Sequence, residues 1–267
     1  IHIINPWGNE ALDMDYYVNH ETGLRPHEPS NDHFNINGIP NKVVALSSPM
    51  VGLLDLLGLG EYIVGVTDPY LIYNKAIKKR IEQEEIQDVG KSIQINMERI
   101  MMLQPDLVIG SGWDQLSADY EKLIQLKITS VLMYDWQEIH PLGKAEWMIA
   151  LASFFNEEKK AKELFQTIKD RYQNQKEHLS FDFQPLVFNG SEYQGIWYSA
   201  GGQSYMSQLY SDAQANYLMK EDSTTGSIML DFEVVMHQAA HADIWMYTGS
   251  TQPERLDLFK SGKYQSL

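Results

Sequence analysis

The sequence predicts an α/β protein with two Rossmann-like lobes, mostly parallel sheets and one long backbone helix that joins the lobes. From residue 43 onwards, short apolar strands alternate with helical segments, an order typical of parallel sheets with right-handed crossovers. A charged segment at residues 157–178 keeps helical spacing along one apolar face and contains no strand. A short pattern also occurs twice, once in each half of the chain.

The repeated pattern places a glutamate at the start of a short apolar helix. Asn96 stands two residues before Glu98 in the first copy, and Asp231 stands two residues before Glu233 in the second. Asn and Asp are favoured N-cap residues because their side chains accept a backbone N–H of the first turn. In each copy a buried strand follows. The repeat therefore predicts two lobes of similar build, which is the plan of a two-lobed binding protein more than of a one-site enzyme.

The elements are expected in a regular order along the chain. Strands are expected at residues 43–46, 63–66, 106–109, 130–133, 185–189, 195–199 and 243–247, and helices at 50–57, 115–126, 142–155, 157–178 and 204–210. Gly58 is expected to close the first helix and Asn156 to cap the long one. Four parts follow: an N-terminal arm or hairpin (1–41), an N-terminal α/β lobe (42–141), linking helices (142–184) and a C-terminal α/β lobe (185–267).

Composition excludes several classes of function. The formal net charge is −15, from 21 basic and 36 acidic residues, and this argues against binding to nucleic acid or to anionic lipid. The chain has no cysteine, so disulfides, thiolate metal sites and cysteine nucleophiles are all excluded. No apolar run reaches the roughly 18–20 residues of a membrane span. The first residues do not read as a signal peptide, and any targeting segment is expected to have been cut off or never supplied.

Residues that follow the strands are the candidates for a ligand pocket, because open α/β sheets bind ligands outside the carboxyl ends of their strands. Flat aromatic rings there suit stacking on a corrin, a porphyrin or a catecholate, and amide and hydroxyl groups suit its polar rim. About half of the candidates are expected to contact ligand. They are Ser47, Ser48, Asp68, Gly110, Ser111, Trp113, Asp135, Trp136, Asn189, Tyr198 and Gly202.

Motifs for catalysis or cofactor binding are weak. His237 and His241 are four residues apart and would share a helix face, but their apolar flanks favour packing or a surface position over a metal site. Gly58-Leu-Gly60 follows a helix and lacks a third glycine, so it does not read as a dinucleotide fingerprint. No nucleophile elbow, P-loop or His-Glu-x-x-His string occurs. No catalytic residue, metal site or cofactor is therefore expected.

Several strings resemble the class III periplasmic substrate-binding proteins of ABC importers for iron–siderophore, haem and cobalamin. They are Lys42-Val-Val-Ala-Leu, Ile63-Val-Gly-Val, Asn96-Met-Glu-Arg-Ile, Leu103-Gln-Pro-Asp-Leu-Val-Ile and Ala242-Asp-Ile-Trp, together with the long helix at 157–178. Asn5-Pro-Trp and Pro141-Leu-Gly-Lys-Ala-Glu-Trp are similar to a gut-bacterial lipoprotein branch of that family. The resemblance covers residues 42–267 for the family and nearly the whole chain for the branch.

The resemblance implies a monomeric lipoprotein of the periplasm or cell envelope that holds its ligand between two lobes. Family members dock on the importer's membrane subunits through one glutamate per lobe, and these glutamates match Glu98 and Glu233. Members usually continue past the last strand, whereas this sequence stops at Leu267. The C-terminal lobe is therefore expected to be incomplete, with some pocket residues missing.

Three functions are weighed. The preferred one is a non-enzymatic, solute-binding component that delivers a large metal chelate (ferric siderophore, haem or corrinoid) to a membrane permease. A second is a surface lipoprotein that binds and hands over such a ligand without an importer. A third, less favoured, is a metal-dependent α/β enzyme that uses His237 and His241.

Overall fold

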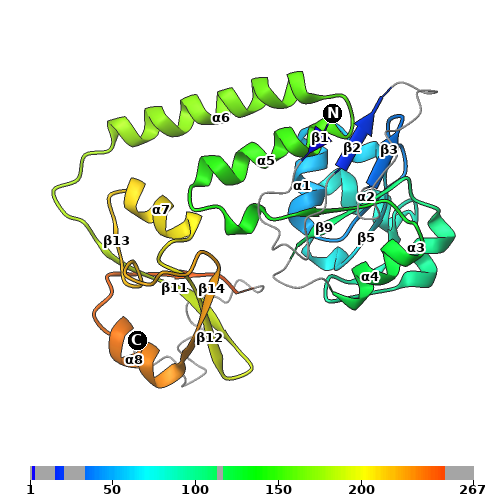
Figure 1. Cartoon of the computed structure of the whole chain (residues 1–267). Helices are drawn as coiled ribbons and strands as arrows, with labels where there is room; N and C mark the ends of the chain where they lie inside the picture. Colours follow the sequence, from blue (N-terminus) through cyan, green and yellow to red (C-terminus); the bar gives the residue numbers. More distant parts are fainter. Residues whose placement is uncertain (1, 4–15, 21–33, 113–116, 250–267) are drawn as a thin grey trace. The chain divides into compact units, whose positions relative to one another are not determined.

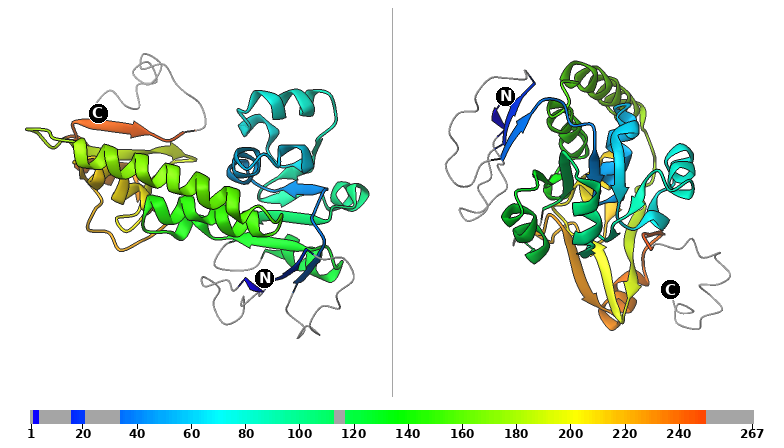
Figure 2. Two further views of the ribbon diagram at one scale, coloured as in Figure 1. Left: turned by 90° about the horizontal axis from the view of Figure 1, so that it is seen from above. Right: turned by 90° about the vertical axis from the view of Figure 1, so that its right-hand side faces the viewer.

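The computed structural model describes residues 2–3, 16–20, 34–112 and 117–249 (Figure 1). The chain forms two compact units. The N-terminal unit contains residues 1–134 and 146–166, and the C-terminal unit contains residues 135–145 and 167–267. Helices α5 (Pro141–Ser153) and α6 (Glu158–His178) each contribute residues to both units. In Figures 1 and 2, α6 is one uninterrupted helix, as the sequence predicts. No helix in the described residues is long and apolar enough to cross a membrane.

The N-terminal unit is built on a five-stranded parallel sheet with the strand order β10-β9-β4-β5-β6. Its strands are β4 (Val43–Ala45), β5 (Ile63–Val66), β6 (Gln87–Asp88), β9 (Leu107–Ser111) and β10 (Ser130–Met133). All residues of β4 and β10 are buried, as are the first four of β9. Strands buried on both faces are typical of parallel sheets covered by helices, and this explains why they read as continuous apolar runs.

The helices of this sheet are α1 (Ser48–Leu56), α2 (Lys75–Glu82), α3 (Met97–Leu103) and α4 (Ala118–Gln125). From the central strand β4 the chain moves through β5 to β6 on one side, and it returns to β9 and β10 on the other. Right-handed crossovers in such a doubly wound sheet place α1 and α2 on one face and α3 and α4 on the other. The reversal of direction between β4 and β9 marks the topological switch point of the sheet.

Helix α1 ends as the sequence predicts, whereas α6 does not begin as expected. Gly58 has φ +75°, its N–H donates to the carbonyl of Asp55, and the N–H of Leu59 donates to that of Leu54. This pair of hydrogen bonds is a Schellman motif. Asn156, expected to cap α6, lies one residue too early, in the left-handed conformation with φ +59°. It forms the turn between the two helices instead, a role for which Asn is suited because it tolerates positive φ.

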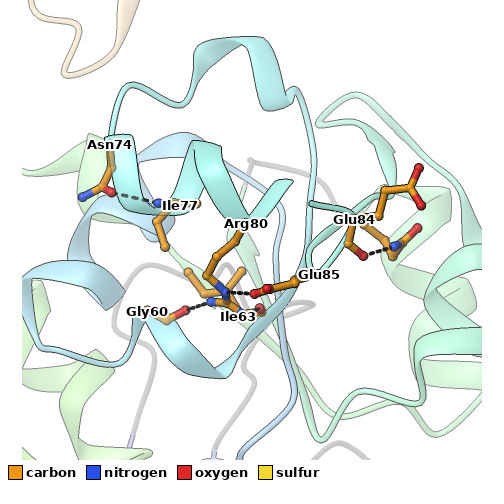
Figure 3. Close-up of polar contacts among 8 residues, drawn as sticks. Gly60, Ile63, Asn74, Ile77, Arg80, Glu84 and Glu85 are labelled. Carbon is orange, nitrogen blue, oxygen red and sulfur yellow. Dashed lines mark hydrogen bonds and ion pairs between the residues drawn. The ribbon is translucent and has the colours of Figure 1, made fainter. Parts of the chain in front are cut away.

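Arg80 fastens α2 to the edge of the sheet (Figure 3). Its guanidinium donates to the carbonyl oxygens of Gly60 at 2.7 Å and Ile63 at 3.1 Å, and its Nε donates to Glu85 at 3.0 Å. The start of the same helix is capped by Asn74, whose Oδ1 accepts the N–H of Ile77 at 3.0 Å. Because Ile63 begins β5, these contacts fix the strand that leads into the loop at residue 67.

The C-terminal unit has a mixed sheet, which differs from the purely parallel arrangement of the other unit. β11 (Leu186–Tyr193) pairs in parallel with β13 (Asn216–Tyr217) and β15 (Ile244–Tyr247). The same strand pairs antiparallel with β12 (Ile196–Ala200), which pairs antiparallel with β14 (Ser227–Asp231). Helices α7 (Tyr205–Asp212) and α8 (Phe232–Ala239) complete the unit.

A two-residue turn explains the antiparallel part. Gln194 and Gly195 both have positive φ, 53° and 87°, between the paired residues Tyr193 and Ile196. Two such residues form the type I′ turn that suits a tight hairpin. The sequence predicts both strands and mostly parallel sheets, but it did not predict that these two strands form an antiparallel hairpin, because the Gln-Gly dipeptide was not recognised as a turn.

Each unit has its own apolar core. In the C-terminal unit the ring of Phe188 stacks on Trp197 with centroids 5.1 Å apart, and Trp197 lies 5.5 Å from Trp245. Val235 of α8 is fully buried in the same cluster. Trp197 and Trp245 therefore stabilise the core of the C-terminal unit. These two strand-end aromatic residues serve in packing and not in ligand binding.

The remaining elements are short. β1 (His2–Ile3), β2 (Tyr16–Asn19) and β3 (Phe34–Asn37) form a three-stranded sheet, with β1–β2 antiparallel and β2–β3 parallel. β7 (Gly90–Lys91) and β8 (Gln94–Ile95) form a hairpin just before α3. Single 3-10 turns are η1 (Gly60–Tyr62), η2 (Pro69–Leu71) and η3 (Asp135–Gln137).

Candidate functional site

The carboxyl edge of the parallel sheet gathers several of the expected ligand residues in the N-terminal unit. Ser47 and Ser48 follow β4, and Ser111 is the last residue of β9, the neighbouring strand across the switch point. Doubly wound sheets bind ligands in the crevice outside the strand ends at this point. These three serines therefore lie where a ligand of this unit would be expected.

Two hydroxyl groups at this edge are buried without a partner. Ser47 is the N-cap residue of α1, yet its Oγ caps no backbone N–H, and within the described residues it has no hydrogen bond. Thr67, which directly follows the strand β5, is 1% exposed, and its Oγ1 is unpartnered in the same way. A buried polar atom left unsatisfied costs about 1–3 kcal/mol, so each is a natural contact for a ligand or an ordered water. The sequence analysis missed Thr67, although it directly follows a predicted strand.

Asp68, at the same edge, forms hydrogen bonds within the protein. It is 8% exposed and adopts the left-handed conformation with φ 47°. Its Oδ2 accepts the N–H of Ser92 at 2.8 Å, and its own N–H donates to the carbonyl of Gly90 at 3.0 Å. Asp68 therefore ties the loop after β5 to the β7–β8 hairpin.

Gly110 packs inside the unit and not on its surface. It is buried, and a Cβ at this position would overlap the hydroxyl of Tyr120. The glycine is needed for the close approach of α4 to β9, so its expected ligand contact is replaced by a packing role. Tyr134, a strand-end aromatic, is likewise buried, at 1% exposure. Trp113, the remaining candidate of this unit, lies outside the described residues.

Asp135 and Trp136 follow β10 and belong to the C-terminal unit. Asp135 is 5% exposed and forms an ion pair with the Lys144 ammonium, which also lies 4.8 Å from the ring centroid of Tyr205. The carboxylate is therefore neutralised within its own unit. The half-buried ring of Trp136 packs against Gly226, where a Cβ would come within 2.9 Å of it.

Asn189 is a buried hub of hydrogen bonds. Its Oδ1 accepts from Ser199 Oγ at 2.8 Å, Tyr217 Oη at 2.9 Å and the N–H of Ala200 at 2.9 Å. Its backbone carbonyl also accepts from Trp197 Nε1 at 3.1 Å. The side chain is 2% exposed, so it joins β11 to β12 and β13 and does not face a ligand as expected.

Gly202 and Tyr198 take different positions in the C-terminal unit. Tyr198 is 36% exposed on β12. Gly202 lines a pocket of about 430 Å³ bounded by one polar face of α7. Its N–H points to Asp222 Oδ1 at 3.4 Å. Burial alone would raise the pKa of Asp222, but hydrogen bonds from Thr224 and the Gly202 N–H lower it. The other lining residues are Ile139, His140, Gln203, Ser204, Ser207, Gln208, Ser211, Ala215, Asn216, Tyr217 and Lys220.

Asp212 at the end of α7 is a buried carboxylate with several hydrogen-bond donors around it, and the sequence analysis missed it. Lys176 Nζ at 2.7 Å, Tyr172 Oη at 2.6 Å and Gln208 Nε2 at 2.8 Å all donate to its carboxylate. Burial opposes ionisation, yet these hydrogen bonds and the charge of Lys176 outweigh it and lower the pKa of Asp212. Burial and the adjacent carboxylate raise the pKa of the Tyr172 phenol. The cluster holds the last turns of α6 against α7.

Glu98 and Glu233 occupy equivalent positions in the two units. Each is the second residue of a short helix, α3 or α8, and the N-cap residue before that helix is extended. Both side chains are exposed, and neither forms a hydrogen bond or ion pair with another described residue. The caps differ, because Asn96 Oδ1 accepts the N–H of Arg99 at 3.0 Å whereas Asp231 makes no side-chain cap bond.

His237 and His241 are both exposed and border a second, shallower pocket together with Glu221 and Asp222. Within the described part of the chain, no group of three or more His, Asp or Glu side chains is arranged to hold a metal ion. The enzyme interpretation therefore gains no support from these two histidines.

A doubly wound parallel unit, a second α/β unit and a long shared helix define the class of two-lobed solute-binding proteins. The chain belongs to the periplasmic binding protein family, whose model matches residues 43–265. The sequence-based assignment to the class III substrate-binding proteins is thereby confirmed.

Two curated relatives are similar over most of this chain. An uncharacterized lipoprotein of Methanocaldococcus jannaschii is 27% identical over 240 residues, which are 84% of this chain and 56% of the relative. The chain therefore spans little more than half of that protein's length. The uncharacterized ABC transporter substrate-binding lipoprotein YvrC of Bacillus subtilis is 27% identical over 86% of this chain and 72% of its own.

Solved structures share the fold. A possible iron-binding (periplasmic solute-binding) protein from Staphylococcus epidermidis superimposes with a TM-score of 0.63, at 21% identity and 85% coverage of both chains. The periplasmic heme-binding protein HutB of Vibrio cholerae gives a TM-score of 0.65, at 15% identity and 84% coverage of both chains. At these identities the likeness extends to the fold alone.

Proposed function

We propose that the chain is the solute-binding component of an ABC importer and captures a large metal chelate. The chelate would be a ferric siderophore, haem or a corrinoid, and the protein would act without catalysis, as a monomer. The family match over residues 43–265 carries this proposal. It is supported by the names of two proteins with the same fold, one a possible iron-binding protein and the other a heme-binding protein.

The carboxyl edge of the N-terminal sheet supports capture of a ligand there. The unpartnered hydroxyls of Ser47 and Thr67 offer hydrogen bonds at this edge, after the neighbouring strands β4 and β5. Tyr70 and Tyr73, in the loop after β5, are 67% and 74% exposed and could stack on a flat macrocycle or catecholate. Ser48, Ser111, Trp136, Tyr198 and Gly202 remain proposed ligand contacts.

A titration tests ligand capture. Purified protein is titrated with cyanocobalamin, haemin and a panel of ferric siderophores, and binding is followed by calorimetry and by quenching of the Trp fluorescence. One compound should saturate at one equivalent with micromolar or tighter affinity. Thr67→Val, which keeps the side-chain shape, should weaken that compound about tenfold, the usual cost of one lost hydrogen bond to a buried group. Lack of response to every compound would move the proposal to another solute class.

Delivery would use Glu98 and Glu233, one carboxylate on each unit, to meet cationic side chains of the membrane subunits. Charge reversal at both positions should abolish the stimulation of ATP hydrolysis by a permease reconstituted in lipid nanodiscs. The affinity for the chelate should stay unchanged. Weaker chelate binding in this variant would contradict the assignment of these residues to docking.

The names of the two curated relatives support a lipid-anchored place in the cell envelope. A lipoprotein that hands over its ligand without an importer is the alternative that these names also fit. It would bind the same chelate, but reversal of Glu98 and Glu233 would leave its transfer of ligand unaffected.

A further inference from the structure

The pocket along α7 lies within the C-terminal unit and has a wall of hydroxyl and amide groups. Ser204 is the N-cap residue of α7, and Ser207, Gln208 and Ser211 follow it at helical spacing, so the four side chains share one face of the helix. We call this cavity of about 430 Å³ the α7 pocket. Its volume lies within the range of roughly 300–1,000 Å³ that is typical of small-molecule sites.

Several polar groups of this wall are available to a ligand. Ser207 is 6% exposed, and its Oγ forms no hydrogen bond with another described residue. The same holds for the side-chain amides of Gln203 and Asn216, which are exposed and line the same pocket. Polar groups of buried residues usually have a partner, so the Ser207 hydroxyl is a natural contact for a molecule that enters the pocket.

Other groups of the wall are bonded within the protein and keep it in place. Ser204 Oγ donates to the carbonyl of Gly201 at 2.7 Å and accepts the N–H of Ser207 at 3.2 Å. Gln208 Nε2 donates to Asp212 Oδ1 at 2.8 Å. A wall that is held by such bonds loses little conformational freedom when a ligand binds.

The charges around the α7 pocket disfavour an ionic ligand. Among the lining residues, Lys220 alone carries a fixed charge, and its side chain is 58% exposed and lies 3.9 Å from Glu221. His140 accepts a backbone N–H on its Nδ1 at 3.0 Å, as a neutral imidazole does. The buried carboxylate of Asp212 lies behind Gln208, and the whole chain has a net charge of −15. An anion would therefore be repelled, and a cation would find no carboxylate in the lining.

We propose that the α7 pocket binds a small neutral compound rich in hydroxyl groups, such as a mono- or disaccharide. Serine hydroxyls and side-chain amides both donate and accept hydrogen bonds, as the hydroxyls of such a compound do. Ile139, which is 58% exposed, offers an apolar side chain to the C–H face of a sugar ring. Of the chelate contacts proposed above, Gly202 lines this pocket, whereas Trp136 and Tyr198 do not. The inference therefore concerns a second site, beyond the capture of a chelate.

A titration with defined probes tests the inference. Saturation-transfer NMR on the purified protein measures the dissociation constants of glucose, galactose, maltose and myo-inositol, with citrate and succinate as anionic probes. At least one neutral compound should bind with a dissociation constant of about 1 mM or tighter, and both anions should bind about tenfold more weakly or not at all. Addition of a saturating chelate should leave this constant unchanged.

Two variants and a matched control place the binding in the α7 pocket. Gln203→Ala/Asn216→Ala removes two exposed amides of the wall and should weaken the bound compound about tenfold, since two hydrogen bonds are lost. The control Gln173→Ala/Gln175→Ala removes two exposed amides of α6 outside the pocket and should change the dissociation constant less than about twofold. Ser207→Leu fills the pocket and should abolish binding, and its melting temperature shows whether the variant folds.

Every other outcome counts against the inference. If none of the four neutral compounds binds at about 10 mM, the pocket holds only water and the inference fails, although chelate capture stands. If the anions bind more tightly than the neutral compounds, the assigned class of ligand is wrong. If Gln203→Ala/Asn216→Ala weakens the chelate in place of the sugar, the pocket belongs to the chelate site and there is no second site. If the control variant weakens the sugar equally, the sugar binds elsewhere.

Discussion

At the scale of single residues, Gly110 illustrates how a candidate ligand residue becomes a packing residue. A side chain here would overlap the Tyr120 hydroxyl, so Gly110→Ala should destabilise the protein by about 1–3 kcal/mol, the usual cost of overpacking. Urea unfolding measures this. Tyr120→Phe removes the clashing oxygen, and the double variant Gly110→Ala/Tyr120→Phe should recover part of the loss. Full additivity of the two changes would show that the clash is not the cause.

Asp212 gives the protein a defined acid sensitivity. Because its folded pKa lies below the ordinary value of an unfolded Asp, the carboxylate stabilises the fold at neutral pH, and this contribution is lost as the pH falls through the folded pKa. Asp212→Asn should cost on the order of 1–3 kcal/mol at pH 7. The gap between variant and wild type should narrow at pH 3. Urea unfolding at both pH values checks this, and an equal gap would remove ionisation from the explanation.

The positions of candidate residues were predictable where they depend on strand order, and their environments were not. Ser47 and Ser111 reach the switch point because a buried strand precedes each. Whether a side chain is free depends on partners far along the chain. Asn189 is occupied by Tyr217, 28 residues away, and Asp68 by Ser92, 24 residues away. Spacing alone cannot reveal such contacts.

At the scale of elements, the repeated strand–cap–glutamate–helix unit can be tested by comparing its two caps. Asn96→Ala removes the bond from the Arg99 N–H and should cost about 0.5–2 kcal/mol. Asp231→Ala should cost less, because Asp231 occupies the same position without a side-chain cap bond. Denaturant unfolding of both variants gives the comparison. A larger loss for Asp231→Ala would mean that it stabilises α8 in another way.

Hydrophobic periodicity predicted which segments are helices and which are strands, but it did not predict how the strands pair. The strands Ile63–Val66 and Ser130–Met133 begin and end where the sequence predicts, because a short apolar run bounded by turn residues indicates a buried strand. The second sheet is mixed because Gln194 and Gly195 reverse the chain. Helix α2 was also missed, since its residues Lys75–Glu82 are mostly charged and only Ile77 is buried.

At the scale of the whole molecule, the excess of negative charge should make docking sensitive to salt. If the carboxylates of Glu98 and Glu233 meet cationic partners, raising the salt from 50 to 500 mM should weaken half-maximal stimulation of the permease severalfold. Chelate affinity should change less, because the proposed contacts are hydroxyl and aromatic groups. A salt-independent docking constant would favour apolar contact alone on both units.

The class of the protein could be predicted from the sequence because two features indicate two lobes. One is the motif that occurs once in each half of the chain, and the other is the single long helix. The ligand could not be predicted, since four of the eleven candidate contacts, Asp68, Gly110, Asp135 and Asn189, are committed to internal contacts. The residues that can bind a ligand are those whose polar groups have no partner within the protein, and these are identified only in the folded structure.

Helix α1 is held at its C-terminal end by the long helix α6, and its N-terminal end lies at the switch point. At its far end Lys160 of α6 donates to the carbonyl of Leu57 at 2.5 Å, beside the Schellman turn at Gly58, and at its near end it begins with the serines of the switch point. A ligand that contacts those serines would meet a helix anchored on α6, so α1 would not move towards the ligand on binding. This unit would then recognise its ligand with a pre-formed surface, and chelates of a different shape would be excluded without a conformational change of the protein.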